Sequence, residues 1–190
     1  MKAFDFDNTL YRGESTVDLL IYVIRKNKRI ALWMPVIFWN MIKYKLCIIS
    51  GERMEAIAES FFKDISFDRE ELEKYVREFW QKNSCKLENA MLKRIGKDDL
   101  IITAGPSFLF EPIKHKLGTA NLICSEVDID KGKLVYLNFS SNKVKRFREV
   151  YGERKISVFY TDSYNDQAMM DISDKVFLIK IRRRKVKRIK

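Results

Sequence analysis

The chain has 190 residues, of which 46% are hydrophobic and 13% aromatic. This composition supports a folded core and excludes global disorder. Lys and Arg number 37 against 26 Asp and Glu, which gives a net charge of +11. Residues 180–190 hold eight of the basic residues and no acid, so the other residues carry only +3. Binding of a polyanion would therefore depend on this tail rather than on the whole surface.

The three cysteines, Cys47, Cys85 and Cys124, lie far apart and show neither CxxC nor Cys/His spacing. This pattern argues against a disulfide framework and against a zinc site, and it favours reduced thiols. No secretory signal opens the chain, because Asp5 and Asp7 interrupt its first apolar stretch. We therefore expect a cytoplasmic protein.

Short apolar runs that end at polar or glycine-containing turns predict the strands of a parallel sheet. They lie at residues 1–6, 100–103, 120–124, 156–160 and 176–180. Residues 127–135 alternate apolar and polar side chains around Lys131-Gly132, which predicts an appended β-hairpin. Residues 143–151 then predict a helix with its apolar side chains inward; these are Val144, Phe147 and Val150.

About seventy residues between the first two strands have a helical pattern. Residues 15–18 resemble a helix start of the capping-box type. Three groups of apolar residues then follow at helical spacing. They are Val17, Leu20, Ile21 and Ile24; Met54, Ile57, Ala58, Phe61 and Phe62; and Leu72, Tyr75, Val76, Phe79 and Trp80.

Two acidic motifs follow predicted strands. Asp5 and Asp7 are two residues apart, so on a strand both would point to one side, at the carboxyl end where α/β sheets build their sites. A calcium loop starting at Asp5 is excluded, because its sixth and twelfth positions lack the required Gly and Glu. Asp162 and Asp166 follow another strand. Four carboxylates at two strand ends predict a site for a hard cation, and oxygen ligands favour Mg²⁺ over zinc.

Four motifs occur in the order known from one family: DFDNTL at residues 5–10, Thr103 at the end of an apolar strand, Lys143 in SNKV, and DSYND at 162–166. The chain resembles the haloacid dehalogenase (HAD) superfamily over essentially its whole length. The helical insert and the short chain are most similar to the phosphoserine-phosphatase-like branch with a C1 cap. The resemblance implies an α/β fold, with a HAD-type Rossmann-like parallel sheet core at 1–13 and 84–190 and an inserted all-helical cap at 14–83.

The resemblance also implies roles for the motif residues. Asp5 would attack phosphorus as the nucleophile, and Asp7 would protonate the leaving oxygen and then deprotonate water. Thr103 and Ala104 would bind the phosphoryl oxygens through a hydroxyl and a backbone N–H. Lys143 would hold Asp5 and the phosphate together, with Lys145 as the alternative lysine.

Metal ligands follow from the same resemblance. Mg²⁺ would sit on Asp5, the carbonyl of Asp7 and Asp162, with Asp166 as a direct or water-mediated ligand. Asp7 also discriminates among family members, because dehalogenases lack this second acid and P-type ATPases have Thr there. The expected activity is Mg²⁺-dependent hydrolysis of a small phosphorylated metabolite through an aspartyl-phosphate.

Residues 30–49 are unusually apolar, but Pro35, Asn40, Lys43 and Lys45 interrupt them, and the longest apolar run falls below the ~18 residues of a spanning helix. Two interpretations stay open. The segment is either a cap helix pair that roofs the site, or an interfacial element whose Trp33, Trp39 and Tyr44 reach lipid headgroups. Some members of this branch act on phosphorylated lipids, so a lipid-phosphate phosphatase at an anionic membrane is the alternative function.

The basic tail lacks aromatic residues in its last ten positions and accompanies no nucleic-acid module, so we expect no specific nucleic-acid partner. A solvated tail, or one that contacts anionic lipid together with the apolar segment, is favoured. A non-enzymatic, membrane- or nucleic-acid-associated protein on the same fold is the competing class. The sequence leaves the oligomeric state open.

Overall fold

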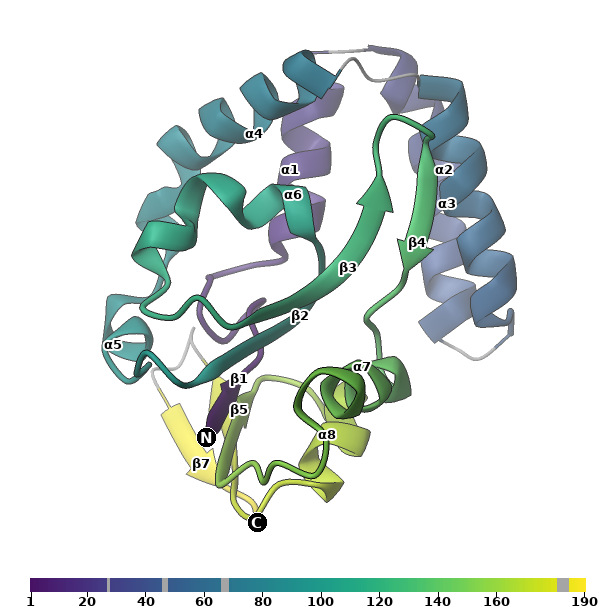
Figure 1. Ribbon diagram of the computed structural model, residues 1–190. Helices are drawn as coiled ribbons and strands as arrows, with labels where there is room; N and C mark the ends of the chain where they lie inside the picture. Colours follow the sequence, from purple (N-terminus) through teal and green to yellow (C-terminus); the bar gives the residue numbers. More distant parts are fainter. Residues whose placement is uncertain (27, 46–47, 66–68, 181–184) are drawn as a thin grey trace.

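The computed structural model describes residues 1–26, 28–45, 48–65, 69–180 and 185–190. Within these residues, seven strands form one sheet in the order β4-β3-β2-β1-β5-β6-β7 (Figure 1). The strands are β1 (Lys2–Phe4), β2 (Leu100–Pro106), β3 (Leu122–Asp128), β4 (Lys133–Tyr136), β5 (Val158–Thr161), β6 (Val176–Lys180) and β7 (Lys185–Arg188). The five inner strands are parallel, and the edge strands β4 and β7 are antiparallel to their neighbours.

The predicted α/β class and the five parallel strands are confirmed, four of the strands with different bounds. β2 runs on to Pro106 and β3 to Asp128. The predicted hairpin at 127–135 is confirmed, because β3 and β4 pair antiparallel, with Val127 opposite Leu134 and Asp128 opposite Lys133. Its first strand is the end of β3 rather than a separate strand.

Successive side chains of a strand point to opposite faces of the sheet, and the buried ones form two hydrophobic cores, one on each side. Phe4 and Tyr160 face the side of α6 (Ser107–Phe110) and η2 (Glu111–Lys116). Ala3 and Phe159 face α7 (Ser141–Tyr151) and α8 (Gln167–Asp171), which lie on the other side in Figure 1. Burial of such large apolar side chains contributes about 1.5–3 kcal/mol each. The two cores hold the strand ends rigid.

The inward side of α7 differs from the prediction. Lys143, Phe147 and Tyr151, spaced four residues apart, face inward, and the rings of Phe147 and Tyr151 lie 5.5 Å apart. Val150 is exposed. Phe147 and Val144 pack into this core as predicted, so only Val150 is wrong. The apolar pattern did not include Lys143, which the motif had placed at the site.

Four helices between β1 and β2 form the insertion: α1 (Ser15–Ile24), α2 (Lys28–Lys45), α3 (Gly51–Ile65) and α4 (Arg69–Asn83). They lie beyond the carboxyl ends of the parallel strands (Figure 1). The short η1 (Ser84–Lys86) and α5 (Asn89–Leu92) lead back to β2, and η3 (Tyr164–Asp166) precedes α8. This arrangement places helical side chains opposite the strand ends. The division into cap and core at 14–83 stays a prediction.

The faces of these helices are partly as predicted. In α4, the predicted apolar side is buried, apart from half-buried Tyr75. In α1, the most buried positions are Ser15, Leu19 and Val23, whereas Ile21 is exposed. The inward face starts at the buried serine, which the apolar pattern did not include. In α3, Phe61 is buried and Ile57 is half-buried, and the side chains of the other predicted positions lie outside the described ones.

The apolar segment matches neither predicted alternative fully. Residues 28–45 form one helix that continues through Pro35, and its partner is α3. Ile30 is fully buried. Trp33 donates from Nε1 to Asp64 Oδ2 at 2.6 Å and packs against the ring of Phe61, contacts that support the cap interpretation. The placement of this segment at lipid headgroups stays a prediction. Tyr44, also predicted there, has a side chain outside those described.

No helix in the described part of the chain is long and apolar enough to cross a membrane.

The basic tail is not simply solvated. Residues 185–188 pair with β6 as an edge strand with exposed side chains, and Lys190 Nζ donates to the carbonyls of Met170 and Asp171. Lysines on an edge strand oppose pairing with another chain. In Figure 1, β7 lies at the opposite end of the molecule from α2. The described part of the tail, residues 185–190, therefore does not form one common surface with the apolar helix, contrary to the prediction.

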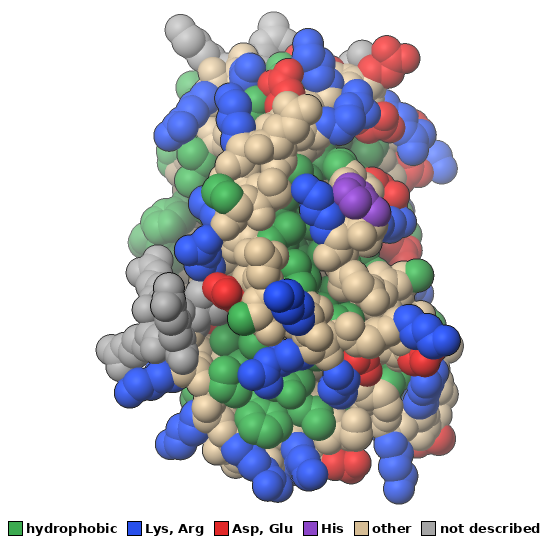
Figure 2. All heavy atoms as spheres, turned by 90° about the vertical axis from the view of Figure 1, so that its left-hand side faces the viewer, with side chains coloured by type: hydrophobic (Ala, Val, Ile, Leu, Met, Phe, Trp, Pro, Cys, Tyr) green, Lys and Arg blue, Asp and Glu red, His purple; other side chains and the backbone are tan. Residues whose placement is uncertain are grey.

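Charge is spread over the face that lies on the left of Figure 1. Figure 2 shows Lys and Arg side chains scattered there, with Asp and Glu among them, rather than one continuous basic patch. Among the residues that the structure describes, this mixed surface offers no continuous basic groove for a nucleic-acid backbone on this face.

Candidate functional site

Asp5 is the first residue after the central strand of the sheet. Its backbone N–H donates to the Tyr160 carbonyl at 2.8 Å, which continues the pairing of β1 with β5. The neighbouring strand β2 carries Thr103 beside it, and Asp162 directly follows the other neighbour, β5. Strand ends that meet in this way form the usual site of parallel α/β sheets.

Asp7 is held at the start of α1. Its Oδ1 accepts the backbone N–H of Ser15 at 2.7 Å, whereas the N-cap residue, Glu14, makes no side-chain cap. Asn8 enters the left-handed region at φ 53°, which Asn tolerates better than most residues, and turns the chain towards the helix. Asp7 thus supplies the cap that the sequence pattern assigned to residues 15–18.

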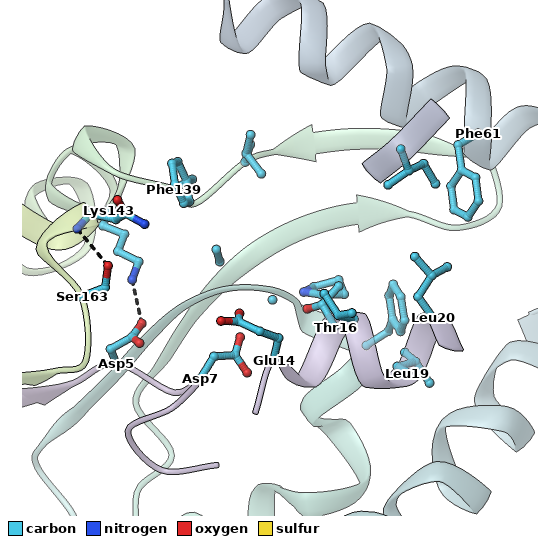
Figure 3. A pocket seen from close by; sticks show the side chains of 18 of the residues that line it. Asp5, Asp7, Glu14, Thr16, Leu19, Leu20, Phe61, Phe139, Lys143 and Ser163 are labelled. Atoms are coloured by element: carbon cyan, nitrogen blue, oxygen red, sulfur yellow. Dashed lines mark hydrogen bonds and ion pairs between the residues drawn. The ribbon is translucent and has the colours of Figure 1, made fainter. Parts of the chain in front are cut away.

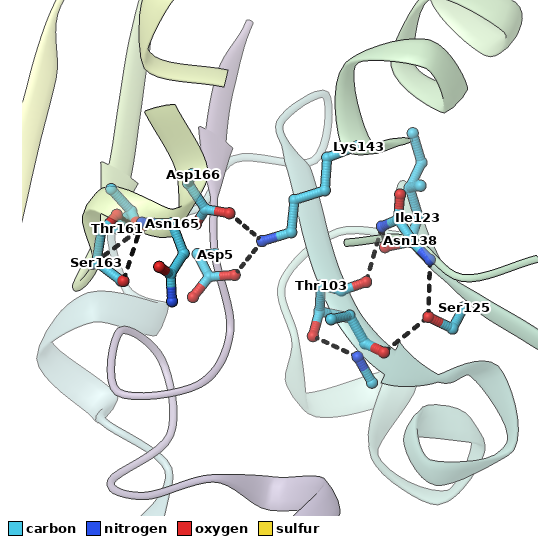
Figure 4. Close-up of polar contacts among 12 residues, drawn as sticks. Asp5, Thr103, Ile123, Ser125, Asn138, Lys143, Thr161, Ser163, Asn165 and Asp166 are labelled. Carbon is cyan, nitrogen blue, oxygen red and sulfur yellow. Dashed lines mark hydrogen bonds and ion pairs between the residues drawn. The ribbon is translucent and has the colours of Figure 1, made fainter. Parts of the chain in front are cut away.

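Lys143 lies between two carboxylates. Its Nζ is 2.8 Å from Asp5 Oδ1 and 2.7 Å from Asp166 Oδ1, and all three side chains are buried (Figure 4). The Thr161 hydroxyl donates to the other oxygen of Asp166 at 2.8 Å. Lys145, the alternative lysine, is exposed. The structure thus places Lys143 and not Lys145 at the strand ends.

Burial shapes the protonation of this cluster. Burial raises the pKa of Asp7 to about 7, although the hydrogen bond from the N–H of Ser15 lowers it. Burial also raises the pKa of Asp162 to about 6, and the negative charges of Glu14 and Asp166 add to this rise. Burial also raises the pKa of Asp5, against the charge of Lys143. Buried carboxylates thus outnumber the single ammonium group, and a further cation would be stabilised there.

The donor set suits a hard cation, because it offers only oxygen atoms. Within the described residues, however, no three acidic, histidine or cysteine side chains stand close enough together to hold a metal ion as they are. Lys143 already occupies one oxygen each of Asp5 and Asp166. The chemistry of the residues fits the cation, but the side chains are not arranged as a finished metal site.

Buried polar contacts fix the end of β2. The amide Nδ2 of Asn138 donates to the Thr103 carbonyl at 2.7 Å, and its backbone N–H donates to Ser125 Oγ at 2.9 Å. Ser125 Oγ in turn donates to the Ala104 carbonyl at 2.7 Å (Figure 4). The Thr103 hydroxyl accepts the N–H of Gly105. These contacts hold the segment that was predicted to bind phosphate.

A cavity of about 550 Å³ opens from the strand ends towards the insertion. Of the predicted site residues, six line it, and Thr103 is not among the described lining residues. The six are Asp5, Asp7, Ala104, Lys143, Asp162 and Asp166. Figure 3 shows the carboxylates of Asp5, Asp7 and Glu14 at one end and Leu19, Leu20 and Phe61 at the other.

The sequence patterns missed several residues of this site. Glu14 looked like an ordinary helix-start residue, but it lines the cavity and accepts from Asn8 Nδ2 at 2.9 Å. Asn138 and Ser125 lie outside the motifs, and no local signal marks them. His115, the single histidine, is exposed in η2 and does not line the cavity.

Comparison with known proteins agrees with the resemblance of the sequence motifs. The model of the haloacid dehalogenase-like hydrolase family matches residues 3–171. No curated protein matches the chain. A solved structure of a protein of unknown function from Bordetella pertussis Tohama I has a TM-score of 0.72 and 20% identity, covering 90% of this chain and 85% of that one.

Two further solved structures carry names. A phosphoserine phosphohydrolase-like protein from Francisella tularensis has a TM-score of 0.58 and 19% identity, over 93% of this chain and 86% of that one. A probable phosphoserine phosphatase from Vibrio cholerae has a TM-score of 0.62 and 14% identity, over 92% and 55%. At these identities the shared property is the fold.

Proposed function

Because the chain belongs to the haloacid dehalogenase-like hydrolase family, we propose that it is a Mg²⁺-dependent phosphomonoester phosphatase. The observation that carries the proposal is the buried pair of Asp5 and Lys143 at the carboxyl end of the central strand, with Asp7 two residues further on. The named structural neighbours support the choice of phosphate esters over other substrates of the family.

In the first step, a carboxylate oxygen of Asp5 attacks phosphorus, and the bond from phosphorus to the ester oxygen breaks. The departing alkoxide takes its proton from Asp7 and leaves as an alcohol. Burial, which raises the pKa of Asp7 to about 7, keeps a fraction of this carboxyl protonated near neutral pH. The phosphoryl group is then bound to Asp5 as an acyl phosphate.

In the second step, Asp7, now ionised, takes a proton from water, and the water oxygen attacks phosphorus. The bond to Asp5 breaks, inorganic phosphate leaves, and both aspartates return to their starting states. Lys143 stays protonated, because Asp5 and Asp166 raise its pKa against the effect of burial. Its charge opposes the repulsion between the Asp5 carboxylate and the incoming phosphate.

The residues that would hold Mg²⁺ are Asp5, Asp162 and the carbonyl of Asp7. The ion supplies positive charge that neutralises the transferring phosphoryl group. Asp166, both of whose oxygens are engaged by Lys143 and Thr161, positions the lysine, and it would contact the ion through water. Ala104, which lines the cavity, would donate its N–H to a phosphoryl oxygen. The Thr103 hydroxyl, which accepts the N–H of Gly105, would donate its hydrogen to a phosphoryl oxygen.

Hydrolysis of p-nitrophenyl phosphate with Mg²⁺, with Ca²⁺ and after chelation tests the proposal. We expect turnover with Mg²⁺ only, because the looser coordination of Ca²⁺ would let Asp5 bind through both oxygens and would so block its attack. Asp5→Asn should lose on the order of 10⁴-fold or more in kcat. Asp174→Asn, which changes an exposed carboxylate, is the matched control. Full activity after chelation, or one tenth of wild-type activity in Asp5→Asn, would contradict the proposal.

The same assay separates the proposal from a non-enzymatic protein on this fold. A binding protein would show no turnover with any metal. Activity that survives in Asp174→Asn and disappears in Asp5→Asn supports the enzyme.

A further inference from the structure

The cavity continues well beyond the carboxylates, and its far part is apolar. Both the helical insertion and the core contribute to the apolar lining. The insertion supplies Val17, Leu19, Leu20, Val23, Ile37, Ile57, Phe61 and Leu72, and the core supplies Pro106, Phe108, Leu137 and Phe139. With about 550 Å³, the cavity has room for much more than a phosphate group.

Charge is confined to one end of the cavity. Among the described lining residues, the charged side chains are those of the catalytic cluster and Glu14, and Lys143 is the one cation. From the insertion proper, the described lining side chains are apolar except for Thr16. An ammonium or carboxylate group placed among them would be buried without a partner, which is costly. An amino-acid phosphate therefore fits this part of the cavity poorly.

We propose that the substrate is a phosphate monoester of an apolar alcohol, with the phosphate at Asp5 and the hydrocarbon among the side chains of α1, α2 and α3. This inference rests on the proposed function and names its substrate class. Of the two classes that the sequence left open, the cavity favours the lipid phosphate over a polar metabolite. Two sources share this chemistry: short esters free in water and long-chain phosphates held in a bilayer.

A series of n-alkyl phosphates of increasing length, each kept below its micelle concentration, tests the class. We expect kcat/KM to rise with length by up to about fourfold per methylene, since each buried methylene contributes roughly 0.8 kcal/mol. Phosphoserine and a sugar phosphate are the polar comparators and should have lower kcat/KM than the long esters. Vesicles that contain a diacylglycerol phosphate form the bilayer arm, with phosphate release as the measurement.

Leu20→Trp and Leu20→Ala probe the cavity itself. Leu20→Trp fills the cavity and should flatten the rise of kcat/KM with chain length. Leu20→Ala enlarges the cavity and should shift this rise to longer esters. Val150→Ala, an exposed apolar position on α7, is the matched control and should keep the wild-type slope. If one Leu20 variant does not fold, the other still tests the slope.

The outcomes separate the two proposals. Activity that depends on Asp5 but is flat with chain length, or highest with phosphoserine, overturns the substrate class and leaves the phosphatase standing. Loss of all turnover with every ester overturns the phosphatase itself. Release of phosphate from short esters but not from vesicles assigns the substrate to the aqueous source, and the reverse assigns it to the bilayer.

A second, independent observation concerns the outside of α2. Leu32, Val36 and Trp39 lie at positions i, i+4 and i+7 on the side opposite Ile30 and Ile37, and they are 79%, 44% and 58% exposed. A helix that buries one apolar side and exposes another is unusual for a protein surface. Phe38 is exposed beside this stripe.

Basic residues accompany this apolar stripe. Residues 25–45 contain six Lys and Arg and no Asp or Glu. Lys43 Nζ lies over the Trp39 ring at 5.4 Å from its centroid, and Lys26 pairs with Glu78 of α4. We infer that the exposed side of α2 docks on an anionic bilayer, with the apolar side chains in the interface and the cations at the headgroups.

Sedimentation with vesicles tests the docking surface. Wild-type protein should sediment with phosphatidylglycerol-containing vesicles, and part of the binding should survive high salt, because buried apolar area is insensitive to screening. Leu32→Ser combined with Trp39→Ser should weaken binding at least tenfold, whereas Val150→Ser should not. No sedimentation, or complete release in high salt, would overturn the inference.

Discussion

The Nζ atom of Lys143 lies 2.8 Å from Asp5 Oδ1, although 138 residues separate the two in the chain. Asp5 directly follows the central strand, and Lys143 lies in the first turn of α7, after the β3–β4 hairpin. Only the folded sheet brings them together, and their burial strengthens the attraction between their charges. The candidate site is thus a product of strand order and not of local sequence.

Lys143→Ala should lower kcat/KM by about 100-fold or more, because the phosphate then meets Asp5 and Asp166 without a counter-charge. Lys145→Ala changes an exposed lysine two residues away and should leave kcat/KM at its wild-type value. Steady-state kinetics of both variants, with thermal unfolding to verify that they fold, make the comparison. Equal losses in the two variants would argue against the assigned role of Lys143.

Asn138→Ala should reduce kcat by about tenfold to 100-fold. The Asn138 amide holds the carbonyl of Thr103 in place, and without it the phosphate-binding segment should shift. A displacement of about 1 Å at the reacting phosphate is enough to lower kcat by this factor. Asn138 is a positioning residue, and its fully buried Oδ1 has no hydrogen-bond partner among the described atoms. Asn89→Ala, at an exposed position of α5, is the control.

The measurement for Asn138 is kcat on the folded fraction, together with the midpoint of thermal unfolding. A lower midpoint with unchanged kcat would show that the residue stabilises the fold without positioning the site.

Gly105→Ala should destabilise the protein by about 1–3 kcal/mol. A Cβ at this position would lie 2.8 Å from Phe110 Cζ, and Phe110 is fully buried, with its ring 4.8 Å from that of Phe6. Denaturant unfolding of Gly105→Ala, Phe110→Leu and the double variant forms a cycle. The smaller side chain at 110 should recover part of the loss, and strict additivity would contradict the assigned clash.

Asp99 links β1 to β2 and should make stability depend on pH. Burial opposes its charge, but hydrogen bonds from the N–H groups of Gly96 and Lys2 and from Lys2 Nζ outweigh this and lower the pKa of Asp99. A lowered folded-state pKa stabilises the protein above the unfolded value of about 3.9, and this contribution is lost as the pH falls through the folded-state pKa.

Asp99→Asn should therefore lower the free energy of unfolding by about 1–3 kcal/mol at pH 7, with a difference that shrinks below about pH 4. Asp98→Asn, at an exposed position, should show little change. Denaturant unfolding of both variants across this pH range gives the comparison. A difference that stays constant with pH would contradict the charge-based explanation.

Local patterns predicted the elements well where one signal dominates. β6 has the predicted bounds, 176–180, because a run of apolar residues fills a strand buried on both sides. The apolar side of α4 was predicted correctly, because the four residues that are buried against the core recur at helical spacing in the sequence. The motif acids were recognised because two carboxylates at a strand end have few structural explanations.

Other features depend on tertiary contacts that local patterns do not contain. Asn138 and Ser125 act through carbonyls of distant strands. Asp166 pairs with a lysine and a threonine, so its contacts could not be read from motif order. The basic tail pairs with β6 although its charges suggested a solvated segment, because an edge strand tolerates exposed lysines. The pattern around Trp33 left a cap helix and an interfacial element open, and only the contacts of Trp33 with Phe61 and Asp64 show that it packs against another helix.

Trapping the phosphorylated enzyme tests the central claim most directly. In Asp7→Asn, the leaving group still departs as the p-nitrophenolate anion, which needs no proton donor, but water is no longer activated, so the phosphorylated protein should accumulate. Acid quenching during turnover, followed by peptide mass spectrometry, should locate one phosphoryl group on Asp5, and the Asp5→Asn, Asp7→Asn double variant should carry none. A phosphoryl group on another residue, or a burst of p-nitrophenol with an unmodified protein, would contradict the account.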